Sequence, residues 1–147
     1  MVFECYRAAS DNQIYIDRDD TKSNRLPQRL ISNEDEIKKY LLKNNFISVK
    51  LHETKFREQI NLFHNAECIV GQHGAGFVNV VFCKPGTKII ELRGFSTGNT
   101  IKNLSKKNDL NYSSIDVEAK ETYEFDIPTQ HGSIEIPISS LIKALEN

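Results

Sequence analysis

Short apolar runs alternate along the chain with longer segments whose apolar residues recur every three or four positions. Runs rich in Ile and Val have the length of buried strands, and the longer segments have the spacing of helices packed on one face. The predicted strands are residues 13–16, 47–51, 68–70, 88–92 and 110–117. The predicted helices are residues 33–45, 54–63, 77–82, 100–108 and 138–147. This alternation predicts an α/β fold.

Strands that alternate with helices predict a mostly parallel, Rossmann-like sheet with right-handed crossovers and helices on both faces. The 147 residues, 1–147, are enough for one such domain with a full core and too few for two. Outside this pattern, residues 1–12 are predicted as an edge strand or a linker, 21–29 as a loop, and 123–136 as a polar excursion or hairpin.

Two of the predicted helices start with recognisable signals. Asn33, with a glutamate three residues later, resembles a capping box, and Thr54 has the side chain of an N-cap residue. In the helix that follows Thr54, the apolar residues Phe56, Ile60 and Phe63 share one face, which is predicted to pack on the sheet.

The stretch from Ala66 to Arg93 holds the strongest candidate for a site. Strand 68–70 is followed by the turn His73-Gly74-Ala75-Gly76 and by the apolar run 77–82, which is predicted to be a short helix buried on all sides. Such a turn leaves backbone N–H groups unpaired at the carboxyl end of a strand, where they can bind an anion. Because Gly74 and Gly76 lack a Cβ atom, a phosphate could approach the main chain closely.

On the residues of this turn alone, an anion site and a purely structural turn are equally favoured. The spacing departs from the G-x-G-x-x-G of dinucleotide folds, and the Gly-Lys-Ser/Thr of the Walker loop is missing. Two glycines also serve tight turns that bind nothing. The carboxyl ends of other predicted strands add Arg18, and Glu91 with Arg93, to the same edge of the sheet, which favours a ligand site there.

The composition is that of an ordinary globular protein, with 39 % hydrophobic and 27 % charged residues. A net charge of −1 without a Lys/Arg block argues against a nucleic-acid partner. No apolar run reaches the about 18 residues of a membrane span, and no signal peptide is evident. The odd number of cysteines, Cys5, Cys68 and Cys83, predicts reduced thiols, which fits a cytoplasmic protein.

The segment GQHGAGFVNVVFCKPGTKIIEL, with IYIDRDD before it and residues 29–34 between, resembles the carboxyl-terminal half of the family 61 glycosyltransferases. This family includes plant xylosyl- and arabinosyltransferases, animal protein O-linked N-acetylglucosaminyltransferases and many bacterial polysaccharide enzymes. The likeness spans about Gln13 to Arg93. Its most specific part is His-Gly-Ala-Gly followed by Asn79, Phe82, Pro85-Gly86 and Glu91.

The resemblance implies an inverting, metal-independent transferase of the two-domain GT-B type, whose second domain binds the nucleotide sugar. It also implies transfer to a hydroxyl acceptor in polysaccharide or glycan biosynthesis, with no cofactor besides the donor. A domain of this size supplies one half of such an enzyme. The chain is therefore expected to be the carboxyl-terminal part of a longer protein or a half that needs a partner chain, and the base that deprotonates the acceptor is expected outside it.

His73 is the predicted catalytic residue. Its imidazole could hydrogen-bond a departing diphosphate, and as an imidazolium it would also neutralise charge. From the residues alone, a turn histidine satisfied by local backbone is favoured, and the resemblance reverses that preference. The position of His73 suits stabilisation of the leaving group better than proton abstraction from the acceptor.

The predicted donor-binding residues are Arg18, Arg29, Gly74, Ala75, Gly76, Asn79 and Glu91. The fork of Arg18 matches a diphosphate, but an ion pair with a neighbouring aspartate is equally favoured. Arg29 corresponds to a recurrent arginine of the family. Glu91 could accept hydrogen bonds from ribose hydroxyls, the alternative being an outward-facing edge residue. Asn79 needs a polar partner within its apolar run, and support of the loop is favoured over contact with the ligand.

Asp17 and Asp19 match the D-x-D pattern that holds Mg²⁺ or Mn²⁺ in the other major glycosyltransferase fold. Two acids at this spacing are common in loops, and the resemblance favours the metal-independent group, so no metal is predicted. Two rival functions stay open: a non-catalytic nucleotide- or sugar-binding module of the same fold and, less favoured, another Rossmann-like enzyme such as a phosphotransferase.

Overall fold

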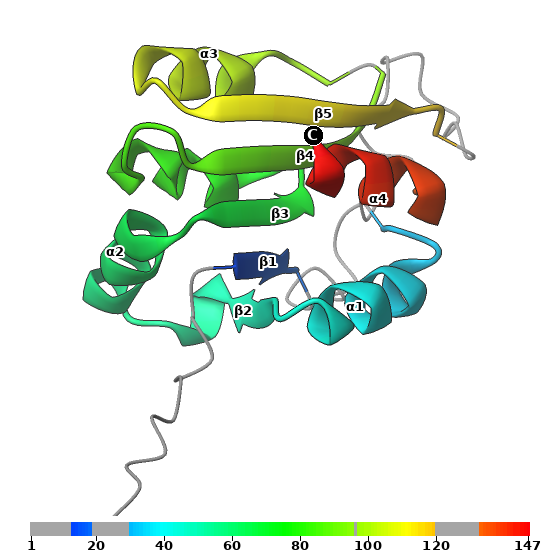
Figure 1. Ribbon diagram of the computed structural model, residues 1–147, viewed down its shortest axis with the longest axis horizontal. Coiled ribbons are helices and arrows are strands. Elements are labelled where there is room, and N and C mark those ends of the chain that lie inside the picture. Colours follow the sequence, from blue (N-terminus) through cyan, green and yellow to red (C-terminus); the bar gives the residue numbers. More distant parts are fainter. Residues whose placement is uncertain (1–12, 19–29, 96, 120–132) are drawn as a thin grey trace, which may run out of the picture.

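The computed structural model describes residues 13–18, 30–95, 97–119 and 133–147. Its centre is a five-stranded sheet in which all neighbouring strands are parallel, in the order β2-β1-β3-β4-β5 (Figure 1). The strands are β1 (Gln13–Asp17), β2 (Ile47–Lys50), β3 (Cys68–Gln72), β4 (Lys88–Gly94) and β5 (Asn111–Val117). The predicted α/β, Rossmann-like sheet is confirmed.

Helices cover both faces of this sheet. They are α1 (Glu34–Lys43), α2 (Phe56–Asn65), α3 (Thr100–Lys107) and α4 (Ile138–Glu146), with the 3₁₀ helices η2 (Leu51–Glu53) and η3 (Ala75–Phe82). The helices α1 and α4 lie on one face, and α2 and α3 lie on the other (Figure 1). Two apolar cores result, one with Val70, Ile37 and Leu141, the other with Ile69 and Phe63. Ile69 and Val70 point to opposite faces, as successive residues of a strand do.

The order of the strands reverses at β1. From β1 the chain crosses by way of α1 to β2 at one edge, returns through α2 to β3 on the other side of β1, and then continues outward to β4 and β5. The segments that follow β1 and β3 therefore lead to opposite faces, to α1 and to η3. In open α/β sheets, ligands bind in the crevice that such a reversal leaves at the carboxyl ends of the strands.

The connection after β3 differs from the prediction of a helix buried on all sides. Residues 75–82 form the 3₁₀ helix η3, in which Phe77 and Val80 are buried, whereas Val78 and Val81 are exposed. A helix that packs on one face of a sheet has a side toward the sheet and a side toward solvent. Some residues of η3 are therefore exposed although nearly all of them are apolar.

The predictions for the start of α2 are confirmed only in part. Phe63 is buried as expected, but Phe56 is exposed and packs its ring edge-to-face on Phe82, with 5.9 Å between the ring centroids. No side chain caps the helix, because the Thr54 hydroxyl donates to the carbonyl of Lys50 instead.

Asn33 lies at the N-terminus of α1, but its side chain does not cap the helix. Its Nδ2 donates to the Ile136 carbonyl at 2.8 Å, and its Oδ1 accepts from the Ile136 N–H at 3.0 Å. The backbone extends this pairing, since the Ser32 N–H donates to the Ile134 carbonyl and the Ile134 N–H to the Leu30 carbonyl. The predicted capping box is therefore wrong, because a segment 103 residues further along the chain engages the same side chain.

The predicted strands are otherwise confirmed, and β3 and β4 extend further than expected, to Gln72 and Gly94. The predictions for residues 1–12, for 21–29 and for most of 123–136 lie outside the described residues. Among the described helices, none combines the length and the hydrophobicity that a membrane crossing requires.

Candidate functional site

A cavity of about 160 Å³ opens at the crevice where the strand order reverses. Its lining includes Arg18 after β1, Leu51 and His52 of η2, Gln72 at the end of β3, and the glycine-rich turn 74–76. The predicted donor-binding residues of the first strand end and of the turn therefore come together around one space. Gln72 and His52 join them without having been predicted, because their positions at strand ends became apparent only with the strand order.

The backbone N–H groups on either side of the glycine-rich turn are hydrogen-bonded within the protein. The His73 N–H donates to the Leu92 carbonyl at 2.9 Å, and the Phe77 N–H donates to the Gly74 carbonyl at 3.1 Å. Neither bond uses the N–H groups of residues 74–76, and these three residues line the cavity. N–H groups at the start of a helix attract anions, so the turn has the composition of an anion site.

The guanidinium of Arg18 lies directly over Gly74. Its Nη1 donates to the His73 carbonyl at 2.9 Å, and a Cβ atom added to Gly74 would lie 2.8 Å from this nitrogen. Gly74 has an extended backbone with φ of 169°, which any residue can adopt, so the absence of a Cβ atom matters here for the position of the Arg18 side chain, which a larger residue would displace. A Cβ atom on Gly76 would likewise lie 2.7 Å from Leu51 Cδ1. The turn thus brings a permanent positive charge to the wall of the cavity.

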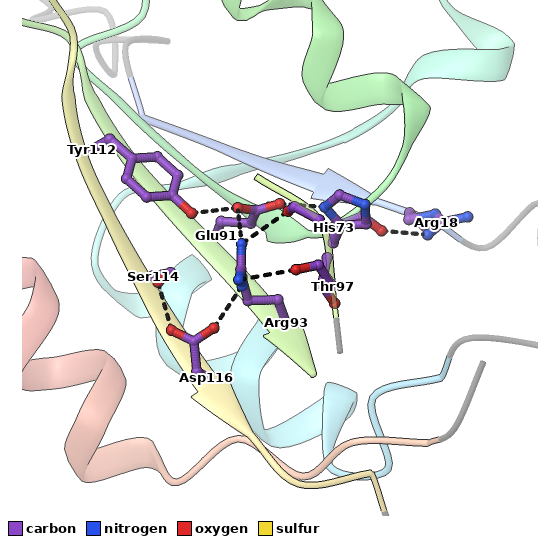
Figure 2. A network of polar contacts seen from close by, with 9 residues as sticks. Arg18, His73, Glu91, Arg93, Thr97, Tyr112, Ser114 and Asp116 are labelled. Carbon is purple, nitrogen blue, oxygen red and sulfur yellow. Dashed lines mark hydrogen bonds and ion pairs between the residues drawn. The ribbon is translucent and has the colours of Figure 1, made fainter. Parts of the chain in front are cut away.

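His73 follows β3 and contacts a carboxylate of the neighbouring strand. Its Nδ1 lies 2.5 Å from Oε1 of Glu91 on β4 (Figure 2). The His73 side chain is 17 % exposed, whereas that of Glu91 has no exposed surface. The strand register sets this contact, because Gly71, two residues before His73, is paired with Glu91. A carboxylate on one imidazole nitrogen orients the ring and stabilises positive charge on it.

The second oxygen of Glu91 is also occupied. The Tyr112 hydroxyl donates to Oε2 at 2.5 Å, and Nη1 of Arg93 lies 3.7 Å from it. Burial, followed by the hydrogen bond to Glu91 and its charge, raises the pKa of Tyr112 to about 12, so the hydroxyl stays protonated as a donor. The placement of Glu91 therefore suits a role in holding His73, because a fully buried carboxylate has no surface for the ribose contact predicted from its position.

Arg93 connects β4 to β5 and to the loop that follows β4. Its Nε donates to Oδ1 of Asp116 at 2.5 Å, and its Nη1 and Nη2 donate to the carbonyls of Gly98 and Thr97, each at 3.1 Å. The Ser114 hydroxyl donates to Oδ2 of Asp116 at 2.7 Å. Burial by itself lowers the pKa of Arg93, but the charge of Asp116 and the hydrogen bond to it outweigh burial, so the pKa is raised.

The pairing of β4 with β5 assembles these groups. In the register of the two strands, Glu91 lies opposite Ser114 and Arg93 opposite Asp116. Residues two apart on a strand share a face, so the side chains meet on the side of α2 and α3. We call the set the Glu91 cluster; it consists of His73, Glu91, Arg93, Tyr112, Ser114 and Asp116 (Figure 2). The three β5 residues were not predicted, although their alternating polar positions, 112, 114 and 116, are visible in the sequence.

Asn79 supports the wall of the cavity from behind. Its Nδ2 donates to Oε1 of Gln59 at 2.8 Å, and Gln59 Nε2 donates to the carbonyls of Leu51 and Thr54 at 2.8 and 2.9 Å. Because Leu51 lines the cavity, this chain of hydrogen bonds holds η2 against η3. The arrangement corresponds to the loop-supporting role that the sequence favoured for Asn79, with Gln59 as its partner.

Arg29 and Asp19 lie outside the described residues, so their predicted roles stay predictions. Asp17, the other member of the D-x-D pair, accepts a hydrogen bond from Ser48 at 3.0 Å and forms an ion pair with Lys38 at 2.9 Å. In the part of the chain that the structure describes, no group of three His, Cys, Asp or Glu side chains could hold a metal ion.

Comparison with protein families identifies the family of the chain. The family model described as Glycosyltransferase 61 matches residues 3–90, which is more than half of the chain. The matched range contains β1, the glycine-rich turn and η3, and it ends within β4, one residue before Glu91. A search of curated proteins found no match. The match over residues 3–90 confirms the resemblance seen in the sequence, and the chain belongs to glycosyltransferase family 61.

Proposed function

We propose that this chain is the donor-binding domain of an inverting glycosyltransferase, which transfers a sugar from a nucleotide-sugar donor to a hydroxyl acceptor. The observation that carries the proposal is the cavity at the reversal of strand order, where Arg18 and the turn 74–76 meet beside His73. A fixed cation, backbone N–H groups and an imidazole are groups that stabilise a diphosphate. Family membership supports glycosyl transfer as the class of reaction.

In the proposed mechanism, the diphosphate of the donor lies on the glycine-rich turn. The N–H groups of residues 74–76 and the guanidinium of Arg18 bind its oxygens, with Arg29 as a further candidate. His73, oriented by Glu91, neutralises the charge that develops as the sugar leaves. The acceptor hydroxyl attacks the anomeric carbon from the opposite side, which inverts its configuration. Its proton passes to a base that we place outside this domain.

The size of the cavity supports a two-domain enzyme of the GT-B type. Pockets that enclose a drug-sized ligand measure about 300–1,000 Å³, whereas this cavity measures about 160 Å³. Its size suits part of the donor, such as the diphosphate, better than a complete nucleotide sugar. We therefore propose that a second domain or a partner chain completes the cleft and brings the acceptor, in an enzyme of polysaccharide or glycan biosynthesis.

The proposed reaction does not depend on a metal ion. Arg18, His73 and the turn provide the positive charge that a divalent cation supplies to the diphosphate in other sugar transferases. The carboxylate of Asp17 is engaged by Lys38 and Ser48, which supports this reading. The affinity for UDP or GDP should therefore be the same in EDTA as in Mg²⁺ or Mn²⁺, and a loss of binding in EDTA would contradict metal independence.

Isothermal titration calorimetry with UDP, GDP, UDP-sugars and NAD tests the donor site. We expect a nucleoside diphosphate to bind, and we expect His73→Ala to weaken its binding about tenfold, which is the size of a lost hydrogen bond to a charged group. His73 is not itself among the lining residues but directly precedes the turn 74–76, which is. His64→Ala is the matched control, because His64 is an exposed histidine of α2 that contacts the Phe82 carbonyl and lies outside both the lining and the turn. Binding of NAD alone would refute the proposal.

A binding module without transferase activity would also bind UDP, so binding does not separate it from the transferase. The module stays a candidate because the ionisable groups beside the cavity are engaged with one another, and among the described residues we assign no base to the acceptor. Release of UDP from a UDP-sugar separates the two functions. Slow hydrolysis by the chain, abolished in His73→Ala, supports the transferase. UDP binding without turnover, even with the second domain present, would favour the module.

A further inference from the structure

We propose that Tyr112 and Arg93 are positioning residues that keep Glu91 ionised, so that Glu91 holds a proton on Nδ1 of His73 and leaves Nε2 to meet the ligand. The identity of that ligand, a diphosphate, rests on the proposed function. The protonation of the His73 ring can be measured in the protein without any ligand, so the two proposals can fail separately.

The groups around Glu91 favour its ionised form. Oε1 faces Nδ1 of His73 at 2.5 Å, while Oε2 faces the Tyr112 hydroxyl at 2.5 Å and Nη1 of Arg93 at 3.7 Å. A carboxylate accepts at both oxygens, whereas a carboxylic acid must point an O–H at an acceptor. Arg93 has no acceptor atom and its positive charge favours the carboxylate, and the Tyr112 hydroxyl could accept a hydrogen bond from a protonated Oε2 only by giving up its own donation to that oxygen. Tyr112 and Arg93 therefore disfavour protonation of Glu91 on the side away from the histidine.

With Glu91 ionised, Nδ1 of His73 is the donor of the contact between them. The second ring nitrogen, Nε2, then lies on the side of the ring away from Glu91, and among the described residues it has no hydrogen-bond partner. The side chain keeps 17 % of its surface exposed. A neutral ring of this form presents a lone pair at Nε2, and the protonated ring presents a donor there, with Glu91 as counter-ion. The protonated form is the one that binds a departing diphosphate.

Charged groups approach His73 from three strands. Glu91 on β4 contacts the ring, Arg18 after β1 donates to the His73 carbonyl, and Arg93 lies behind Glu91 with its ion pair to Asp116 on β5. Because Asp116 and two loop carbonyls occupy the guanidinium of Arg93, it does not displace the histidine as the close partner of Glu91. The negative charge of Glu91 is thus left beside the imidazole.

Stability alone does not explain this arrangement. Buried charged pairs are costly to desolvate, and apolar residues of similar volume often stabilise a core equally well or better. Ile89, which lies opposite Tyr112 and two residues before Glu91, belongs to the apolar core on the same face. The polar side chains begin where that core ends, toward the carboxyl ends of β4 and β5, which is the end at which ligands bind.

Nitrogen-15 NMR of the ligand-free protein tests the inference, because the ring-nitrogen shifts of a histidine show which nitrogen carries the proton. We expect His73, assigned by the loss of its signals in His73→Ala, to have a protonated Nδ1. In Tyr112→Phe the population with an unprotonated Nδ1 should rise about tenfold, the size of a hydrogen bond to a charged group. Glu91→Gln should give both tautomers, because an amide offers a donor and an acceptor.

Tyr15→Phe is the matched control. Tyr15 is also buried and donates its hydroxyl to a glutamate, Glu34, at 2.9 Å, but on the face of α1. It should leave the ring of His73 unchanged. An unprotonated Nδ1 in the wild type, or an unchanged ring in a folded Tyr112→Phe protein, would overturn the inference. If Glu91→Gln does not fold, the measurement on Tyr112→Phe still tests the inference, because the loss of a single hydroxyl is expected to leave the protein folded.

Titration with UDP and GDP then separates the inference from the proposed function. Tyr112→Phe should weaken binding of the nucleoside diphosphate several-fold while Tyr15→Phe does not, and equal affinities in Tyr112→Phe and the wild type would overturn the role of Nε2. A wild type with a protonated Nδ1 that binds no nucleoside diphosphate would refute the proposed function and leave the positioning of His73 by Glu91 and Tyr112 in place.

Discussion

Two clusters of matching chemical composition lie on opposite faces of the sheet near its carboxyl edge. On the face of α1, a set that we call the Glu34 cluster consists of Tyr15, Asp17, Glu34, Lys38 and Ser48. The Glu91 cluster lies on the other face. In each cluster a tyrosine donates to a glutamate, a serine donates to an aspartate, and a basic side chain lies between the two acids.

Exposure to water distinguishes the glutamate and the basic residue of one cluster from those of the other. The side chains of Lys38 and Glu34 are 24 % and 26 % exposed, whereas those of Arg93 and Glu91 are 10 % and 0 % exposed. Of the two, the Glu91 cluster alone contains a histidine. Charges in contact with water are screened and replaceable, whereas charges without water depend on their protein partners for every hydrogen bond. The glutamate and its basic partner are therefore partly solvated on the face of α1 and almost without water on the other face, whereas the aspartates show the reverse, with Asp17 7 % and Asp116 31 % exposed.

Removal of the glutamate should distinguish the clusters most strongly. Glu91→Ala leaves His73 and Arg93 without their shared buried partner, and we expect the free energy of unfolding to fall by about 3–5 kcal/mol. Glu34→Ala removes a partly exposed group and should cost about 0–1 kcal/mol. Urea denaturation of the two variants measures the difference, and equal losses would contradict the contrast between the faces.

Exchange of the basic residue should have the next largest effect. Arg93→Lys keeps the charge but loses the planar fork that reaches Asp116, Thr97 and Gly98, and it should lower the free energy of unfolding by about 2–3 kcal/mol. The loop after β4 should also lose protection in hydrogen exchange. Lys38→Arg serves as the control and should change the stability by less than about 1 kcal/mol. Unchanged protection of the loop in Arg93→Lys would show that the guanidinium does not hold it.

Alkaline pH should weaken the native state through groups that are buried in their protonated form. The pKa of Tyr112 is raised from 10.0 to about 12, mainly by burial, and burial raises the pKa of Tyr15 as well. The free thiols Cys68 and Cys83 are buried, and burial raises their pKa values from 9.0 to about 11 and about 12.

A raised pKa in the folded state means that the stabilising contribution is complete below the unfolded value and is lost as the pH rises through the folded value. The stability should therefore begin to fall near pH 9 with the thiols and continue to fall to about pH 12. Chemical denaturation as a function of pH, under reducing conditions, measures this loss. Tyr112→Phe should reduce the fall of the free energy of unfolding between pH 10 and about 12. An unaltered fall would show that ionisation of the Tyr112 hydroxyl does not contribute to it.

Replacement of Ser105 in α3 should have the smallest effect on stability. Its hydroxyl is fully buried and has no hydrogen-bond partner among the described residues. Ser105→Ala removes this group and improves helix propensity, so we expect the free energy of unfolding to rise by about 0.5–1.5 kcal/mol. A loss of stability in thermal or urea unfolding would show that the hydroxyl has a partner, such as a buried water.

The fold was predictable because its signals are local. Strand lengths, helix spacing and the turn after β3 follow from neighbouring residues, and the carboxyl ends of parallel strands meet at one edge whatever their order. This is why Arg18 and the turn 74–76 could be assigned to one site. The cap predicted at Asn33 was wrong for the opposite reason, since Asn33 is engaged by Ile136 from a distant part of the chain.

The partners of Glu91 were not predictable from the same signals. The polar positions of β5 gain meaning only when the register places Ser114 opposite Glu91 and Asp116 opposite Arg93. That register depends on packing across the sheet, and neighbouring residues do not specify it. The sequence therefore places Glu91 at the correct strand end and suggests a contact with the ligand, whereas the partners of its carboxylate become known only from the structure.

The two hydrogen bonds between the Asn33 side chain and the Ile136 backbone have a consequence for folding during synthesis. Residues 133–147 supply Ile134, Ile136 and Leu141 to the core on the face of α1, and the hydrogen bonds of Asn33 with Ile136 join positions 103 residues apart. At a synthesis rate of about 5–20 residues per second, Asn33 precedes Ile136 by about 5–20 s, and the part of this face that α4 covers stays exposed until residues 133–147 emerge, whereas α1, α2 and α3 emerge between the strands they cover. Chaperones that attend the growing chain should therefore recognise the part of this face that α4 later covers.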